Sequence, residues 1–327
     1  MNNALEIIEN NFNLIQSTIN ETNKLNIIDV TPNTDIVKAD VSQSVASLRE
    51  NKKTYNFGIK AIDDLFILHY GKDINNNDIF TTGIPAGKII LLTGMSGAGK
   101  TLTAFNLFVR LQKQKVKVTF FSGDMDENLT WDYYRRALVG YNASDSEYID
   151  AIATINYPDK PIIDLYMTSG DITVGKIDQY LTKNPQEVIF FDYIDYLQPN
   201  NKKPNKADNN KQLFLELKEL RKKHNVLIIL LCQSSEDKGY KSGRPTLSNT
   251  YGGKEVRSAV DGVIAIYRNY NYNKKLPAHL RNITEVIGLK LRSHARDTLA
   301  LVDVTDGQMH DIDTSKQIQY EEEQNKK

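Results

Sequence analysis

The sequence predicts an α/β fold built on a mainly parallel sheet with helices packed against it. Runs of apolar residues with the length of buried strands alternate with helical patterns along most of the chain, as expected when helices cover both faces of a parallel sheet. Several of these runs end in a polar residue, and ligands collect at the carboxyl ends of parallel strands. The first run, at 89–92, leads into a glycine-rich loop and then a helical pattern. Together these observations predict a nucleotide-binding architecture.

The glycine-rich loop is the feature around which the rest of the chain is organised. Its sequence fits G-x-x-x-x-G-K-[ST] and lies between the apolar run and the helical pattern at 102–112. Glycines let backbone N–H groups approach a polyphosphate, and the helix N-terminus adds its positive dipole end. Lys100 is expected to reach the β- and γ-phosphates, and the Thr101 hydroxyl to bind Mg²⁺. The residues expected to cradle the nucleoside triphosphate are Gly94, Ser96, Gly97, Ala98, Gly99, Lys100 and Thr101.

Composition narrows the class of protein. The 327 residues are 40% hydrophobic and 25% charged, which is typical of a globular protein. No run approaches the ~18 apolar residues of a membrane span, and the N-terminus lacks the order of a signal peptide, so we expect no membrane partner and a cytoplasmic location. The single cysteine, Cys232, cannot form an internal disulfide. With 41 basic and 41 acidic residues, any nucleic-acid contact must come from local patches.

The chain divides into four predicted segments. Residues 1–22 carry one narrow apolar stripe at helical spacing, and 23–53 are polar and expected to form a linker. Residues 54–314 form the nucleotide-binding core, and 315–327 are charged and expected to be disordered. A short helix is marginal alone, so the N-terminal helix must dock on its own core or on a neighbouring subunit, and the sequence leaves both open. The stripe consists of Leu5, Ile8, Phe12, Ile15 and Ile19.

Apolar and amphipathic patterns predict the elements of the core in order. Strands are expected at 116–121, 164–167, 188–192, 226–233, 262–267, 285–292 and 298–303. Helices are expected at 102–112, from within 122–129 to about Gly140, at 174–181 and at 213–224.

Carboxylates at predicted strand ends are candidates for the chemistry of hydrolysis. Asp192 ends an apolar strand and can hold Mg²⁺ through water; Asp195 is a rival, but the apolar run stops at Asp192. Phosphoryl transfer to water also needs a carboxylate to orient or deprotonate the water. Asp124 follows the strand at 116–121 and is expected to do this, with Asp126 and Glu127 as alternatives. Asp124 could equally cap the following helix, and the two roles can coexist.

Three further polar residues fit a nucleotide site. Gln233 ends another buried strand, so its amide is either a structural hydrogen-bonding group or a sensor that touches the γ-phosphate. Lys290 and Arg292 stand two apart on a predicted strand and therefore share one face. Two neighbouring cations repel unless they meet an anion, so the pair forms a structural salt bridge or reaches a neighbour's nucleotide as an arginine finger.

The ordered series of these motifs resembles the RecA-type ATPase core of the DnaB-like replicative helicases, phage members included. The resemblance covers about 55–312, and its marks lie at 94–101, 120–125, 192–198, the strand ending in Gln233, 244–248, 259–268 and 290–292. It implies a RecA-like P-loop NTPase fold, ATP and Mg²⁺ as cofactors, and a homo-oligomer, expected to be a hexameric ring. Partners implied by it are single-stranded DNA and a primase or helicase loader, inside a bacterial or phage-infected cell.

The resemblance also implies roles for particular residues. Lys100, Thr101, Asp192 and Gln233 carry over as nucleotide residues. Lys290 and Arg292 correspond to the pair donated in trans across a ring interface, and Arg268 to a residue that touches the base or the neighbour. Two departures are visible: Asp124 stands where the family has Glu, and the family's helical N-terminal domain is expected to be missing. The helix at 1–22 resembles the linker helix that joins adjacent subunits of these rings.

Two lysine-rich loops are expected to contact DNA because each follows a sheet strand and would face the centre of a ring. Their lysines can track the phosphates of a single strand, although from charge alone they would be ordinary surface loops. Tyr240 and Tyr251 are candidates for base stacking. The basic residues predicted to bind DNA are Lys202, Lys203, Lys206, Lys211, Lys238, Lys241, Arg244 and Lys254.

The sequence therefore predicts an ATP-dependent replicative helicase motor that moves along single-stranded DNA and unwinds duplex. Asp124 would position water, and the neighbour's Lys290 and Arg292 would complete the site. Two other interpretations remain open: a RecA-like recombinase filament, and a KaiC- or loader-like ATPase whose partner is protein.

Overall fold

The structure is a computed structural model of the chain, and it describes residues 53–72, 78–123, 125–155, 172–234, 244–251, 253–291 and 298–326. These belong to one compact unit that begins at Asn51. The predicted N-terminal helix and the predicted strand at 164–167 lie outside the described residues.

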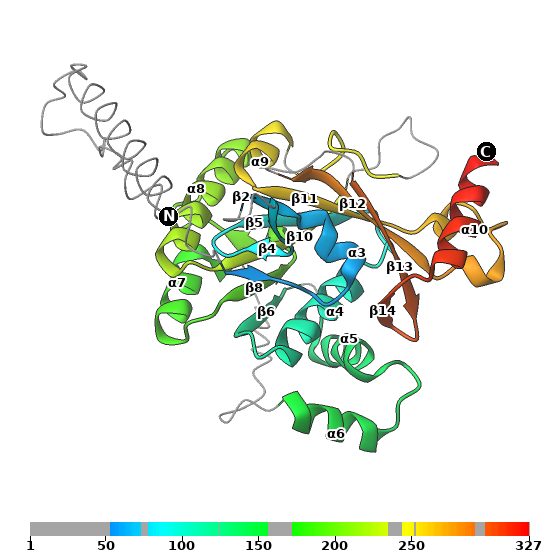
Figure 1. Cartoon of the computed structure of the whole chain (residues 1–327). Helices are drawn as coiled ribbons and strands as arrows, with labels where there is room; N and C mark the ends of the chain where they lie inside the picture. Colours follow the sequence, from blue (N-terminus) through cyan, green and yellow to red (C-terminus); the bar gives the residue numbers. More distant parts are fainter. Residues whose placement is uncertain are drawn as a thin grey trace, which may run out of the picture. The chain divides into compact units, whose positions relative to one another are not determined.

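A large mixed sheet forms the centre of this unit (Figure 1). Its eight described strands are β5 (Ile89–Gly94), β6 (Val118–Ser122), β8 (Val188–Asp192), β10 (Leu227–Gln233), β11 (Gly262–Tyr267), β12 (Ile283–Leu291), β13 (Thr298–Thr305) and β14 (Gln308–Asp311). They lie in the order β14-β13-β12-β11-β5-β10-β8-β6. From β11 to β6 all neighbours are parallel, whereas β12, β13 and β14 extend the sheet in antiparallel pairs. The predicted mainly parallel sheet is confirmed.

Helices cover both faces of the sheet because its central strands are apolar on both sides. The longer described helices are α4 (Lys100–Lys113), α5 (Glu127–Val139), α6 (Asp145–Ile155), α7 (Val174–Lys183), α8 (Lys206–His224), α9 (Gly253–Ala259) and α10 (Thr314–Asn325). Along β8, Phe190 packs into one apolar core with α4 and α5, and its neighbours Ile189 and Phe191 pack into a second core with α7, α8 and α9. Alternate residues of a strand point to opposite faces, so each central strand contributes to both cores.

Small elements complete the described part of the chain. They are β1 (Thr54–Tyr55), α3 (Lys60–Asp63), β2 (Leu68–Lys72), β3 (Asp78–Thr81), β4 (Ile84–Pro85), β7 (Ile172–Thr173) and β9 (Leu197–Gln198), with short 3₁₀ turns at η1 (Asp64–Phe66), η2 (Ile194–Tyr196), η3 (Asn269–Asn271) and η4 (Ala278–Leu280). β1 pairs with β4, β2 with β3, and β7 with β9.

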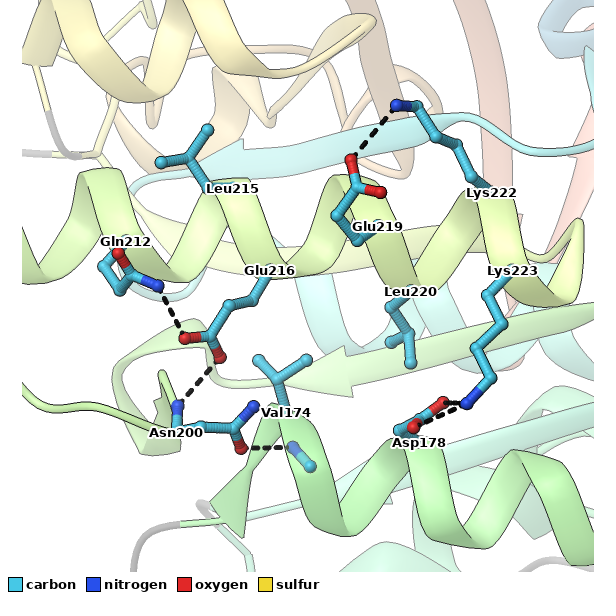
Figure 2. A pocket seen from close by; sticks show the side chains of 11 residues that line it. Val174, Asp178, Asn200, Gln212, Leu215, Glu216, Glu219, Leu220, Lys222 and Lys223 are labelled. Carbon is cyan, nitrogen blue, oxygen red and sulfur yellow. Dashed lines mark hydrogen bonds and ion pairs between the residues drawn. The ribbon is translucent and has the colours of Figure 1, made fainter. Parts of the chain in front are cut away.

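Helices α7 and α8 lie side by side and border a surface groove of about 730 Å³ (Figure 2). Two polar ties cross between the helices. Lys223 of α8 binds Asp178 of α7 at 2.8 Å. At the other end, the Glu216 carboxylate accepts the Asn200 backbone N–H at 2.8 Å, and the Asn200 side chain accepts the Gly175 N–H at 2.6 Å. These contacts hold the two helices against the second core and away from the phosphate-binding loop.

Two sequence predictions need correction. The tail at 315–327 was predicted to be disordered, but α10 forms there with Asp313 as its N-cap, and Tyr320 is 1% exposed. The predicted loop at 200–211 is wrong from Lys206 onward, because α8 begins there, capped by the Asn205 side chain accepting the Ala207 N–H at 2.8 Å. Both segments are rich in charge and poor in apolar residues, so periodicity did not reveal either helix start.

Candidate nucleotide site

The P-loop, 94–101, joins the carboxyl end of β5 to the first turn of α4. Gly97 and Gly99 have φ angles of +72° and +94°, which only glycine adopts without strain. The Ala98 N–H donates to the Met95 carbonyl at 3.1 Å, and the Lys100 ammonium donates to the same oxygen at 3.0 Å. Lys100 is only 6% exposed. The loop therefore curls around a point at which backbone and ammonium donors converge.

Thr101 and Asp192 come together at this edge of the sheet. The Thr101 hydroxyl donates to the Asp192 carboxylate at 2.8 Å, and Asp192 is 1% exposed at the end of β8. A hydroxyl and a carboxylate oxygen at this separation are the hard ligands that Mg²⁺ prefers alongside water and phosphate, so these residues fit that ion. Asp195, the predicted rival, is exposed on η2, and its carboxylate interacts with the Tyr251 hydroxyl.

Gln233 reaches the same edge from the neighbouring strand. β10 pairs with β5 so that Gln233 lies opposite Gly94. The Tyr193 hydroxyl donates to the Gln233 carbonyl oxygen at 3.3 Å, and the Tyr193 ring lies 5.9 Å from the Lys100 ammonium. Cys232, one residue earlier, is fully buried, and burial raises the pKa of its thiol to about 12, which makes it an unreactive core residue.

The predicted water-positioning carboxylate, Asp124, lies outside the described residues. The structure does place its two alternatives. Asp126 is the N-cap of α5, with a side-chain oxygen accepting the Leu129 N–H at 2.8 Å, and Glu127 is exposed in the first turn. The helix-capping role therefore belongs to Asp126, and the role of Asp124 stays a prediction.

Lys290 lies toward the opposite edge of the sheet from the P-loop. β12 runs antiparallel to β11, so Lys290 is level with Val263, which is itself level with Leu91 near the start of β5. The Lys290 ammonium donates to the carbonyls of Arg257 and Val260, the latter at 2.8 Å, at the C-terminal end of α9. Arg292 lies outside the described residues.

Buried charges also stabilise this amino edge. The Asp261 carboxylate, 6% exposed, forms an ion pair with Arg221 and accepts the Ile89 N–H at 3.0 Å. Arg221 additionally donates to the Gly87 carbonyl at 3.0 Å. These contacts join the starts of β5 and β11 to the end of α8.

The segment after β11 forms a further side of the site that the sequence predicted only through Arg268. Arg268 donates to the Arg281 carbonyl at 3.2 Å and to the Asn282 side chain at 3.5 Å. Asn271 was not predicted, yet its amide donates to the Gly97 carbonyl of the P-loop at 3.1 Å. A single Asn within a run of Asn and Tyr residues offers no pattern by which a sequence could reveal it.

The residues predicted to bind DNA are dispersed among different elements. Lys202 and Lys203 are exposed before α8, whereas Lys206 and Lys211 lie on α8 itself. Arg244 forms a 2.5 Å ion pair with Glu285, which is 1% exposed. Lys238 and Lys241 lie outside the described residues together with Tyr240, and Lys254 falls in α9, where its side chain is not described.

Among these residues Arg244 has a clear structural partner. Its guanidinium neutralises the buried Glu285 carboxylate and lies 5.4 Å from the Tyr267 ring. Lys206 lies 5.8 Å from the ring of Tyr251, the other residue predicted to stack on bases. A role for either cation in binding DNA stays a prediction.

Comparison with known proteins identifies the family. The family model for the DnaB-like helicase C-terminal domain matches residues 71–306. The fold is similar to a solved ATPase domain of a DnaB-like helicase, with a TM-score of 0.64 and 20% identity over 84% of this chain and 96% of that one. It is also similar to a DnaB-like replicative helicase solved in a study of its interactions with primase, with a TM-score of 0.65 and 20% identity over 95% of this chain and 74% of that one. No protein with a curated functional description matches.

In the described part of the chain, no helix is long and apolar enough to cross a membrane. The comparisons favour the helicase interpretation and give no support to the recombinase or the loader-like alternative. The RecA-like fold predicted from the sequence is confirmed. The chain belongs to the DnaB-like helicases, ATP-dependent replicative enzymes, and contains their C-terminal ATPase domain.

Proposed function

We propose that this protein is a Mg²⁺-ATP-driven motor that moves along single-stranded DNA and separates duplex strands, with each nucleotide held between two copies of the chain. The observation that carries the proposal is the pair of Thr101 and Asp192, whose side chains meet at 2.8 Å beside Lys100. This arrangement joins a metal-binding hydroxyl and carboxylate to a phosphate-binding loop. It fits nucleoside triphosphate hydrolysis better than simple nucleotide storage.

Each residue of this edge has a role that follows from its contacts. The P-loop N–H groups and Lys100 would hold the β- and γ-phosphates, while Thr101 and Asp192 would hold the metal ion, Asp192 directly or through water. The ion would neutralise charge that develops on the transferred phosphoryl group. Gln233 shares its carbonyl with the Tyr193 hydroxyl and would report the γ-phosphate to the segment after β10. Asp124 remains our candidate for orienting the attacking water.

The topology of the sheet supports sharing of the site between subunits. β12 leaves the sheet at Leu291, which is level with Gly262 and through it with Ile90. That level is four strand residues, about 13 Å, from Gly94 and the P-loop edge. A cation just beyond Leu291 therefore serves another copy's nucleotide more readily than its own. Lys290 would have to leave two carbonyls at the end of α9 to do so, and for this reason we assign the direct contact to Arg292.

A mixed-subunit experiment tests the shared site. Arg292→Ala and Lys100→Ala variants are each expected to lack ATP hydrolysis, because one lacks the donated cation and the other lacks the phosphate-binding ammonium. In a mixture, some interfaces combine an intact Lys100 with an intact Arg292, so hydrolysis should return. Mixtures that stay inactive, while both variants still assemble, would contradict the shared site.

The helicase activity has its own measurements. Single-stranded DNA is expected to accelerate ATP hydrolysis, and ATP to drive displacement of one strand from a forked duplex. Neutralising Lys202, Lys203 and Lys206 together should weaken DNA binding and flatten its dependence on salt, since fewer counterions are released. A matched triple neutralisation on the far end of α8, at Lys218, Lys222 and Lys223, controls for the change in net charge. An unchanged salt slope in the first variant would remove these residues from the DNA interface.

A further inference from the structure

Asn271 contacts the P-loop from outside the phosphate-binding concavity. It is the last residue of η3, the short turn that follows β11, and its side-chain Nδ2 donates to the Gly97 carbonyl at 3.1 Å. Gly97 is exposed and has a φ of +72°, so this part of the loop has little packing of its own. The Asn271 amide is thus a side-chain tether on the most exposed turn of the loop.

The turn that carries Asn271 is itself well fixed. The Asn271 N–H donates to the Arg268 carbonyl at 3.1 Å, and the Tyr272 N–H donates to the Asn269 carbonyl at 3.0 Å. The Tyr272 ring stacks on Tyr267, with 5.6 Å between ring centroids and 12° between planes. These contacts hold the Asn271 side chain at a defined position above the loop.

β11 and the P-loop also approach each other closely at a second point. A side chain at Gly94 would meet the Ile266 carbonyl oxygen, because a Cβ there would lie only 2.6 Å from it. The segment that ends β11 is therefore in contact with the loop at its first residue and, through Asn271, at its crown. Movement of the crown relative to β11 must break the Asn271 contact.

The tether acts on one particular peptide group. Within the peptide that joins Gly97 to Ala98, the carbonyl and the N–H point in opposite directions because the group is planar and trans. A donor that holds the Gly97 carbonyl outward therefore turns the Ala98 N–H inward, where it now bonds the Met95 carbonyl at 3.1 Å. Hydrogen bonds in series polarise one another, so the same donor strengthens the Ala98 N–H as a partner for phosphate oxygens.

We infer that Asn271 is a positioning residue of the nucleotide site, one that holds the Gly97–Ala98 peptide ready for the phosphates of a nucleoside triphosphate. The inference rests on the proposed function of the P-loop and adds a residue to it. The ligand group that gains from Asn271 is the polyphosphate and not the base. A direct contact between Asn271 and the base would have different consequences, which the experiment separates.

The test compares nucleotide binding by the full chain and its Asn271→Ala variant. Binding is measured by displacement of a fluorescent ATP analogue with ATP, GTP or inorganic tripolyphosphate. Loss of one hydrogen bond predicts Kd values about 3- to 10-fold higher for all three competitors. At saturating ATP the hydrolysis rate should stay near that of the unchanged protein, so that KM rises while kcat does not. Asn271→Asp should bind more weakly than Asn271→Ala, because its carboxylate repels both the carbonyl and the phosphates.

Asn273→Ala is the matched control, because Asn273 belongs to the same segment and its side chain accepts a local N–H, from Lys275 at 3.3 Å. It should bind all three competitors as the unchanged protein does. The inference is overturned if Asn271→Ala weakens ATP but not tripolyphosphate, if it leaves all three unchanged, or if Asn273→Ala has the same effect. Failure of the proposed function would look different, since the unchanged protein would then bind none of the competitors and Lys100→Ala would change nothing.

Discussion

The two edges of the central sheet both carry charged side chains, but they engage them in different ways. At the carboxyl edge, the Thr101 hydroxyl bonds Asp192 and the Lys100 ammonium bonds a loop carbonyl, contacts that a metal ion and a phosphate can take over. At the amino edge, Asp261 is neutralised by Arg221, and Lys290 caps the carbonyls of α9. The carboxyl edge is therefore built to exchange partners, whereas the amino edge is built to keep them.

This difference explains why one sheet can serve both as a catalytic surface and as a scaffold. Ionic groups at the carboxyl edge would contribute to turnover and little to folding. Those at the amino edge would contribute to folding, and the strand that ends there would deliver a cation to another copy. Mutations at the two edges should therefore separate activity from stability, and the predictions below test that separation from the largest expected effect to the smallest.

Asp192→Asn should cause the largest change, and only in activity. An amide cannot supply the anionic oxygen that holds Mg²⁺, and the metal contributes several kcal/mol to stabilising the transition state, so hydrolysis should fall by more than about 100-fold. Steady-state ATP hydrolysis measures this effect, and urea unfolding should show little loss of stability. Asp195→Asn is the control, because Asp195 is exposed and should keep nearly full activity. Equal losses in the two variants would mean that the metal site is assigned incorrectly.

Arg221→Met should have the opposite profile. Asp261 would remain as a buried carboxylate without its ion-pair partner, and removing one member of a buried pair costs about 3 kcal/mol or more. Urea unfolding measures the loss, while the Kd for ATP should not change because the P-loop lies at the other edge. Lys88→Met is the control, since Lys88 is 40% exposed and 3.8 Å from Asp261 and should cost less than about 1 kcal/mol. A stable Arg221→Met variant would contradict the structural role given to this edge.

Most of the sheet and of the P-loop site could be predicted from sequence, for physical reasons. Buried strands such as 188–192 and 262–267 are continuous apolar runs, and the residue that stops each run is the one that reaches the carboxyl edge. That is how Asp192 and Gln233 were predicted. The pairing of Thr101 with Asp192 then follows from the order of the parallel strands.

Contacts between segments distant in sequence could not be predicted. Tyr320 anchors the charged helix α10 by donating to Glu285 at 2.7 Å, a partner thirty-five residues earlier on β12. Asn271 meets Gly97, which comes long before it in the chain. In both cases a single polar residue makes the contact, and no periodicity or motif marks it. The corrected starts of α8 and α10 share this cause.

Tyr320→Phe tests the anchoring of α10 and should have an intermediate effect. The phenyl ring keeps the packing of Tyr320, but Glu285 loses a donor in a buried position, and a hydrogen bond to a charged group contributes about 1.5 kcal/mol. The expected result is a lower free energy of urea unfolding with unchanged ATP binding. Ile318→Ala, at a position that is 50% exposed, controls for side-chain truncation on the same helix and should be nearly neutral. If both variants behave alike, Glu285 does not depend on Tyr320.

Asp178→Asn should give the smallest effect, and a pH-dependent one. Hydrogen bonds from Lys223 and His224 hold the pKa of the Asp178 carboxyl below its usual value of 3.8. Because the folded pKa is the lower one, the stabilisation is present above the unfolded pKa and is lost as the pH falls through the folded pKa. The Asp178 side chain is 34% exposed, so solvent screening limits the contribution to about 0.5 kcal/mol. The difference in unfolding free energy between the unchanged protein and Asp178→Asn should therefore shrink between about pH 7 and about pH 3. A difference that persists at low pH would show that the amide disturbs packing between α7 and α8, and that charge is not what joins them.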